Sequence, residues 1–382
     1  MTSNTMLSDL CFFADGRVPV SDLDLGAYIS TENMLPNKEG ITRSAGLPTI
    51  SQTQAYQAED ILISNIRPYF RKIWLADRDG GCSNDVLVLR AKEKVYPNFL
   101  YYLLSNNAFF DYATATAKGT KMPRGDKGSI MRYEVPDLPL DVQIGIADTL
   151  SSLDARIANN TAINHHLEQM AQAIFKSWFV DFEPWGGVMP EGWREGTIRD
   201  TCSAIYNGGT PRRNEPLFWD GNIPWLTSGE VRQAIITEPS GYISQAGLKG
   251  SSAKWVPSFS TIVALYGATA GQVSMVSAPL TTNQAITALV PKDNHAFYNY
   301  LVMRNAVAQL ENKAIGSAQQ NISKAIVEET PCLVADANNI AAFNKLVSPF
   351  FELWIQNLFE SARLAALRDT LLPRLMSGEL SI

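Results

Sequence analysis

Residues 144–178, IGIADTLSSLDARIANNTAINHHLEQMAQAIFKSW, carry a mostly hydrophobic stripe at heptad spacing. Its members follow one another by steps of four and three, and they are Ile146, Leu150, Leu153, Ile157, Asn160, Asn164, Leu167, Ala171, Ile174 and Trp178. This spacing is typical of the seam with which one long helix pairs with another. Two asparagines lie in the middle of the seam, where polar residues lower stability but specify register. The segment therefore predicts a long, paired helix.

A second seam lies 197 residues later in the chain. Its positions are Phe343, Val347, Phe350, Trp354, Asn357, Ser361, Leu364, Arg368, Leu371 and Leu375. Asn160 corresponds to Asn357, and the change from Ala171 to Arg368 interrupts the match. The same offset relates residues just upstream of each helix, Gly119 to Gly316 and Lys127 to Lys324. Either stripe alone fits an ordinary core helix equally well, but two matched stripes favour an antiparallel pair of helices in a duplicated chain.

The composition is that of a folded protein with more than one domain. The chain has 382 residues, of which 46% are hydrophobic and 18% are charged, enough for two or three domains with full cores. It has no apolar run of 18 residues, so we expect no membrane span. Residues 1–10 lack the basic and apolar regions of a signal peptide. The four cysteines are scattered without a CxxC pair, which favours free thiols and a cytoplasmic location.

Charge is distributed unevenly along the chain. The formal net charge is −6, which taken alone argues mildly against nucleic acid. However, residues 61–132 carry 12 Lys or Arg against 6 Asp or Glu, whereas residues 133–200 carry 4 against 11. A basic globular part followed by an acidic helix suits a protein with two kinds of partner, one of them polyanionic.

The rest of the sequence predicts a mixed α/β (α+β) fold. Short β-branched or aromatic runs at 60–75 and 85–90 predict strands, and 98–105 has helical spacing. Residues 261–276 and 282–289 repeat these strands in the second half. We predict a first globular domain at 1–140, a central helix and linker at 141–185, a second globular domain at 186–332 and a C-terminal helix at 333–382. The two helices are predicted to form an antiparallel coiled coil.

No catalytic or metal-binding pattern emerges. The glycine-rich segment 267–271 leads into a strand and lacks the lysine of a phosphate loop. His165 and His166 are adjacent and face different sides of a helix, so they cannot form a two-histidine metal site. We therefore expect a non-catalytic protein without a metal or cofactor of its own.

Basic and aromatic residues in loops are the remaining candidates for binding. Such residues can neutralise phosphates, and Arg can also read base edges; for any single one, a solvated charged face is an equally good explanation. The predicted DNA-binding residues are Arg67, Tyr69, Arg71, Lys72, Lys121, Arg124, Lys127, Arg212, Arg213, Trp225, Lys254, Tyr266 and Lys324. The predicted helix-pairing residues are Leu150, Leu153, Ile157, Asn160, Asn164, Leu167, Ile174, Phe350, Trp354, Asn357, Leu364 and Leu371.

Several strings resemble the specificity subunit of type I restriction-modification systems. The most specific are IFKSWFVDFEP at 174–184, LSSLDARI at 150–157 and LLPRLMSGEL at 371–380. Shorter strings similar to target-recognition-domain signatures are SNIRPYF at 64–70, GTP at 209–211, IPW at 223–225 and TNQ at 282–284. The resemblance covers essentially the whole chain, although the two globular parts share little sequence with each other beyond a framework.

The resemblance implies a DNA sequence-recognition subunit. Each globular part would be a target recognition domain for one half of a bipartite, asymmetric sequence in double-stranded DNA. The helices would space the domains and dock two modification (methyltransferase) subunits, which restriction (translocase/endonuclease) subunits would join. S-adenosylmethionine, ATP and magnesium would belong to these partners. A helix of about 38 residues spans about 57 Å, which limits the half-site separation to about 17 base pairs.

Two other classes of function compete with this interpretation. A nuclease or methyltransferase would need an active site that the sequence does not offer. An assembly scaffold without its own sequence reading would use the helices but not the loops.

Overall fold

The computed structural model describes residues 4–315 and 321–380. Gly316, the predicted counterpart of Gly119, lies outside these residues. The chain divides into two compact units, Met1–Ile157 with Ala362–Ile382, and Ala158–Ser361. Each unit therefore contains one globular part and a segment of each long helix. The domain boundaries predicted from the sequence remain predictions.

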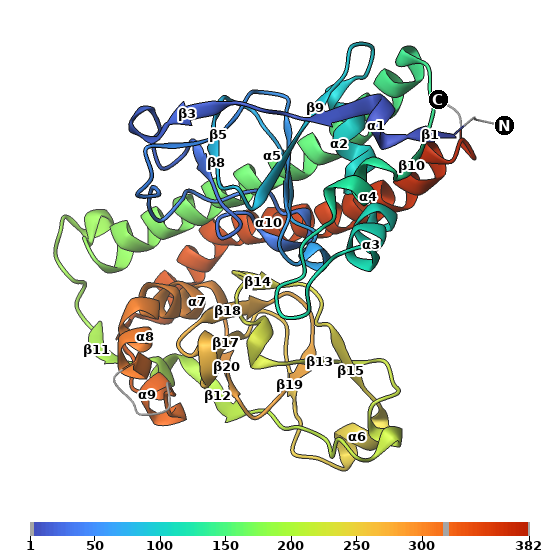
Figure 1. Cartoon of the computed structure of the whole chain (residues 1–382). Coiled ribbons are helices and arrows are strands. Elements are labelled where there is room, and N and C mark those ends of the chain that lie inside the picture. The colour runs from blue at the N-terminus through green and yellow to red at the C-terminus, as the bar shows by residue number, and fades with distance from the viewer. Residues whose placement is uncertain (1–3, 316–320, 381–382) are drawn as a thin grey trace. The chain divides into compact units, whose positions relative to one another are not determined.

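The two long helices are α5 (Leu140–Phe179) and α10 (Ala337–Met376), drawn in Figure 1. They run antiparallel to each other in both units. In the first unit, Arg368 Nη1 lies 2.6 Å from Asp154 Oδ1. In the second unit, the Asn357 amide donates to Asn164 Oδ1 at 2.8 Å. The predicted antiparallel pair is confirmed.

The asparagines on the seam are buried and hydrogen-bonded. Asn160 Nδ2 donates to Glu360 Oε2 at 2.7 Å and to Ser361 Oγ at 3.3 Å. Each asparagine of α5 therefore finds a polar partner on α10, and a shift of one turn would separate these groups. This pairing is a physical reason for polar residues on an otherwise apolar seam. All the predicted helix-pairing residues are buried or half-buried.

The first unit is built on two four-stranded sheets (Figure 1). One has the order β2-β9-β6-β7 and is antiparallel, and the other has the order β3-β5-β8-β4 with β4 parallel to β8. The strands are β2 (Cys11–Phe13), β3 (Arg17–Pro19), β4 (Tyr28–Ile29), β5 (Gln52–Tyr56), β6 (Ile61–Ser64), β7 (Ile73–Leu75), β8 (Gly80–Cys82) and β9 (Val86–Ala91). A further pair joins β1 (Asn4–Met6) to β10 (Glu134–Pro136). The helices besides the long pair are α1 (Leu7–Leu10), α2 (Pro97–Ser105), α3 (Asn107–Ala115) and α4 (Lys127–Met131).

Strand β6 is apolar on both faces because both are covered. Ile61 and Ile63 belong to a core with α2, α3 and the ends of the long helices. Leu62, which points to the opposite face, belongs to a second core with Ile29 and Tyr56 of the other sheet. Because both faces are covered, this central strand has a continuous run of apolar residues instead of alternating apolar and polar ones.

The second unit repeats this plan. Its sheets have the orders β12-β20-β17-β18-β14 and β15-β13-β19-β16, and β13 is parallel to β19 as β4 is to β8. The strands are β12 (Cys202–Asn207), β13 (Ile223–Leu226), β14 (Ile235–Ile236), β15 (Gly241–Ile243), β16 (Trp255–Val256), β17 (Thr261–Ala264), β18 (Val273–Val276), β19 (Leu280–Thr282) and β20 (Ile286–Pro291). A separate pair joins β11 (Arg194–Thr197) to β21 (Pro331–Val334). The shorter helices are α6 (Gln245–Lys249), α7 (Ala296–Asn305), α8 (Val307–Ile315) and α9 (Lys324–Glu328).

The predicted fold class, two similar α/β (α+β) parts with an antiparallel pair of long helices, is confirmed. Within the described ranges, no helix combines the length and apolarity needed to cross a membrane.

Candidate nucleic-acid interface

In the first unit, a tight turn between β6 and β7 carries several predicted DNA-binding residues. Arg67 has φ 51° and Arg71 has φ 53°, both in the left-handed region, and they flank a 3-10 turn at Pro68–Phe70. The turn is joined to the loop that precedes α4, because Ile66 forms a β-bridge with Arg124 and Arg67 N donates to Pro123 O at 2.8 Å. Two basic loops that are distant in sequence thus form one surface.

Most cations on this surface are held by internal partners. Arg71 Nη2 lies 3.2 Å from Asp111 Oδ1, and Arg124 Nη2 lies 2.8 Å from Asp85 Oδ1. Lys72 Nζ donates to a backbone carbonyl, Thr31 O, at 2.6 Å, and burial lowers the pKa of this lysine. These contacts orient the three cations, and Lys121 is exposed on the same surface.

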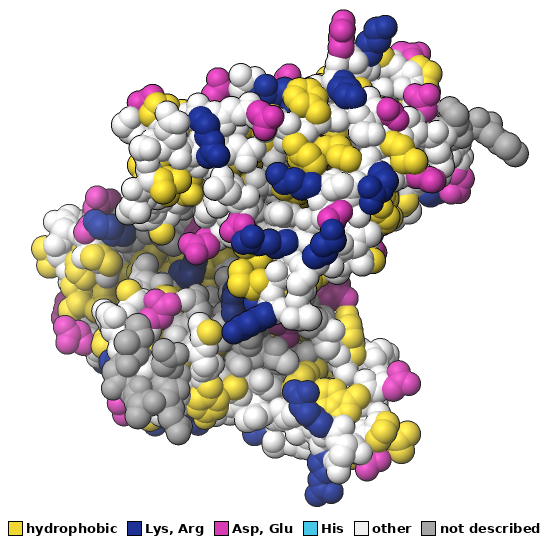
Figure 2. Space-filling view, viewed as in Figure 1, with side chains coloured by type: hydrophobic (Ala, Val, Ile, Leu, Met, Phe, Trp, Pro, Cys, Tyr) yellow, Lys and Arg dark blue, Asp and Glu magenta, His cyan; other side chains and the backbone are white. Residues whose placement is uncertain are grey.

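Exposed apolar side chains lie among these cations. Tyr69 is 48% exposed and Met122 is 49% exposed, and the rings of Tyr69 and Phe70 are 4.8 Å apart. A hollow of about 310 Å³ opens beside them, lined by Thr31, Ser64, Ile66, Arg67, Phe70, Lys72 and Met122. Figure 2 shows Lys and Arg side chains next to hydrophobic ones on the visible face of the first unit. This mixture of guanidinium, ammonium and aromatic groups suits contacts with phosphates and bases.

Lys127 is the first residue of α4 and lies away from this hollow's lining, with Nζ 5.2 Å from the Phe13 ring centroid. The preceding residue, Asp126, caps α4 by accepting a hydrogen bond from Ser129 N at 2.8 Å. The Lys118 ammonium and this backbone hydrogen bond hold the pKa of Asp126 well below its usual range.

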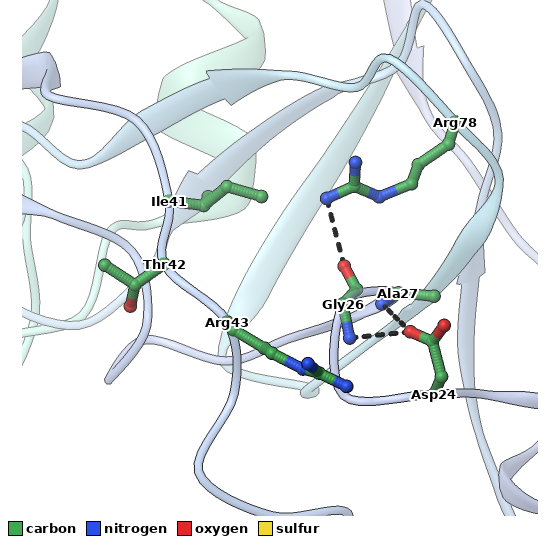
Figure 3. Close-up of a pocket in the computed structure, with 7 residues that line it drawn as sticks. All are labelled: Asp24, Gly26, Ala27, Ile41, Thr42, Arg43 and Arg78. Carbon is green, nitrogen blue, oxygen red and sulfur yellow. Dashed lines mark hydrogen bonds between the residues drawn. The ribbon is translucent and has the colours of Figure 1, made fainter. Parts of the chain in front are cut away.

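A second hollow, of about 500 Å³, lies in the first unit and was not predicted from the sequence (Figure 3). Two arginines, Arg43 and Arg78, line it. Arg78 Nη2 donates to Gly26 O at 3.0 Å and Arg78 Nη1 pairs with Asp77 at 3.0 Å. Asp24 accepts hydrogen bonds from the backbone of Ala27 and Gly26, which lower its pKa together with the two arginines. The two acidic groups therefore balance the charge of the two arginines at this hollow.

In the second unit, the predicted residues are distributed over several loops. Arg213 lies 5.8 Å from the Trp219 ring and Lys254 Nζ lies 5.4 Å from the Tyr206 ring. Arg212 is exposed, and Tyr266 is 45% exposed. Lys324 is held by Ile205 O at 3.3 Å and by Glu328 at 3.1 Å.

Trp225 does not fit the predicted DNA contact. Its side chain is 4% exposed, its indole N–H donates to Gly209 O at 3.0 Å, and its ring packs edge-on against Trp219 at 5.0 Å. It lies on β13, whose side chains alternate between faces, and this alternation turns it into the core. We therefore assign it a supporting role beneath the loops.

Comparison with known proteins shows that the two units match the same family. The family model of the type I restriction modification DNA specificity domain matches residues 6–169 and again residues 190–332. The chain belongs to this family.

Alignments with relatives in the specificity family cover most of the chain. The type I restriction enzyme HindI specificity subunit of Haemophilus influenzae is 28% identical over an alignment that covers 92% of this chain and 94% of that protein. The MjaIX specificity subunit of Methanocaldococcus jannaschii is 25% identical over 76% of this chain and 71% of its own length. The crystal structure of a type I restriction-modification S subunit from M. genitalium has the same fold, with a TM-score of 0.61, 16% identity and coverage of 98% and 96%.

The two copies of the specificity domain repeat parts of their backbone geometry. Tyr266 bridges Asn321 as Ile66 bridges Arg124, at offsets of 200 residues for the first partner and 197 for the second. The left-handed positions repeat as well, and the pairs are Glu59 with Phe259, Lys94 with Asn294, Arg67 with Gly267 and Arg71 with Gly271. A non-glycine residue in this region costs on the order of 1–2 kcal/mol. At the last two pairs, the second copy avoids this cost with glycine and the first does not.

The cysteines of this specificity-family chain are poor nucleophiles. Burial raises the pKa of Cys11, Cys82, Cys202 and Cys332 to about 12 in each case, so their thiols stay protonated at neutral pH. In the part of the chain that the structure describes, no group of three or more His, Cys, Asp or Glu could hold a metal ion.

Proposed function

We propose that this chain reads the DNA target of a type I restriction-modification complex, with each unit reading one half of a bipartite, asymmetric sequence. The observation that carries the proposal is the duplicated DNA specificity domain with cations and aromatic rings exposed in its loops. The loops differ in sequence on a common framework, which suits two different half-sites. Arg and Lys of these loops bind phosphates, and a subset reads base edges.

Two modification subunits dock on the long helices, and restriction subunits join that core. Exposed apolar side chains on the helices support this part of the proposal, because exposed apolar surface on a soluble protein often marks a protein–protein contact. They are Leu140, Ile144 and Leu367 in the first unit and Met170, Leu346, Leu353 and Phe359 in the second. The chain itself is non-catalytic, and S-adenosylmethionine, ATP and magnesium belong to its partners in the cytoplasm.

The test is to co-express the chain with the methyltransferase subunit encoded beside it and to map methylated adenines across a genome. We expect a bipartite motif with a fixed gap, which would reveal both half-sites at once. A continuous motif, or no motif despite a stable complex, would refute bipartite reading and favour a scaffold. Exchange of residues 1–140 for those of a relative should change one half-site and leave the other unchanged.

A further inference from the structure

The turn at Arg67 places a charged side chain where the backbone favours glycine. Arg67 and its counterpart Gly267 have φ 51° and 76°. A Cβ added to Gly267 would meet nothing within 4 Å, so φ rather than lack of space explains the glycine there. In the first unit, a long side chain occupies this left-handed position.

The neighbouring left-handed position differs in this respect. A Cβ on Gly271 would lie 2.8 Å from Glu311 N, so its glycine is also required by space. Its counterpart Arg71 forms an ion pair with Asp111, which repays part of the strain within the protein. Among residues 4–315 and 321–380, by contrast, no hydrogen-bond or ion-pair partner of the Arg67 guanidinium is found.

The surroundings show what kind of ligand this guanidinium would meet. It lines the hollow of about 310 Å³ together with Lys72 and Met122, beside the exposed ring of Tyr69. Its backbone is held by Pro68 and by the hydrogen bond to Pro123 O. The left-handed φ and these backbone contacts fix the direction in which the side chain leaves the turn, and the two parallel donors of its guanidinium suit the paired acceptors of a base edge.

We propose that Arg67 is the specificity-determining residue of this turn and recognises the O6 and N7 acceptors of a guanine in the half-site read by the first unit. This inference rests on the proposed function. A planar guanidinium donates two parallel hydrogen bonds to these acceptors, the commonest specific contact in the major groove. Gly267 offers no such group, so the second unit reads its half-site with other residues.

The experiment uses the full chain in complex with its methyltransferase subunit and compares Arg67→Gly with the unaltered protein. Because glycine adopts the left-handed φ of this position without strain, the variant should fold, and its melting temperature is measured alongside. We expect one guanine position of the first half-site to become degenerate in the methylation motif. Discrimination at that position should fall by about 5- to 150-fold, with the spacer and the second half-site unchanged.

Two controls separate the alternatives. Arg67→Lys keeps the charge but not the paired donors, so it should relax the same position, whereas Lys121→Ala should weaken all sequences equally. A uniform loss of affinity in Arg67→Gly without relaxed specificity, or a first half-site without guanine on either strand, would overturn the inference. An unaltered complex that methylates no bipartite motif would instead refute the proposed function.

Discussion

Replacing Asp154 with alanine should destabilise the first unit by about 3 kcal/mol. Asp154 on α5 accepts a hydrogen bond from Tyr102 Oη at 2.7 Å and pairs with Arg368 Nη1 at 2.6 Å. The side chains of Asp154 and Arg368 are 32% and 25% exposed. A hydrogen bond to a charged group contributes about 1.5–3 kcal/mol, and removing the carboxylate also deprives a partly buried cation of a partner. Arg368 keeps Asp369, at 2.9 Å, which limits the loss.

The assay is thermal and denaturant unfolding of the full chain, followed by circular dichroism. For a domain of 150–250 residues, about 3 kcal/mol corresponds to a shift of roughly 6–12 °C. Asp154→Asn keeps an acceptor for Tyr102 but not the charge, so it should lose about half as much. In a double-mutant cycle with Arg368→Ala, the coupling energy should exceed about 1 kcal/mol. A loss below about 1 kcal/mol for Asp154→Ala, or a coupling energy near zero, would refute this reasoning.

The second unit provides a natural comparison for the same position. Phe351 corresponds to Asp154 at the offset of 197, and it stacks on Phe297 with ring centroids 4.4 Å apart. Ala171 takes the place of Arg368. The triple variant Tyr102→Phe, Asp154→Phe and Arg368→Ala copies this apolar solution without leaving a buried hydroxyl unpartnered. It should recover at least half of the stability lost in Asp154→Ala, because apolar groups of suitable shape often replace a buried ion pair without loss.

Three further predictions concern other parts of the molecule. Asn357→Leu should destabilise the second unit by about 1–3 kcal/mol, because it leaves the buried Asn164 amide without its partner. Replacing both Asn164 and Asn357 with leucine should regain stability, but the NMR lines should broaden because the helices lose a unique register. The indole N–H of Trp193, 2.9 Å from Asp336, and the backbone of Asn339 lower the pKa of Asp336 below its ordinary value of 3.8. This carboxylate stabilises the fold above that pH, so the free energy of unfolding should fall as pH decreases from about 4 through the lowered pKa, and Asp336→Asn should flatten the fall. If the two units neutralise about 8 phosphates, the logarithm of the DNA-binding constant should decrease with the logarithm of the salt concentration at a slope near −7. Binding titrations at several salt concentrations measure this slope. A flat slope would exclude the basic loops as DNA contacts.

Periodicity in the sequence was sufficient to predict the long helices and their pairing. A heptad seam with a copy 197 residues away specifies both the type of element and its partner, because each stripe needs another apolar stripe to cover it. The neighbouring buried stripe, which includes Phe175, Phe179 and Phe351, was not predicted. It packs on the globular part of the second unit, and such contacts depend on tertiary structure that a helical period alone does not reveal.

The candidate site was only partly predictable. Basic residues in loops were found from composition, but burial of Trp225 follows from strand alternation that a motif match ignores. Arg43 and Arg78 meet only because the chain folds back, so no local pattern indicates their hollow. The exchange of Arg67 for Gly267 was visible in the sequence at an offset of 200, yet its meaning required the left-handed φ of both residues.

The two copies keep the backbone in common and vary the chemistry by which each globular part packs on its helix segments. In the first unit a hydroxyl and an ion pair meet at Tyr102, Asp154 and Arg368, and in the second, aromatic rings meet at Phe297 and Phe351. A chimera that exchanges residues 1–140 alone therefore replaces Tyr102 but keeps Asp154, its hydrogen-bond partner on α5. If the incoming domain has an apolar residue at the position of Tyr102, the chimera should be destabilised by about 1.5–3 kcal/mol through the lost hydrogen bond to Asp154, and Asp154→Phe with Arg368→Ala should restore it. Equal melting temperatures for the chimera with and without these helix changes would show that the packing chemistry is not matched.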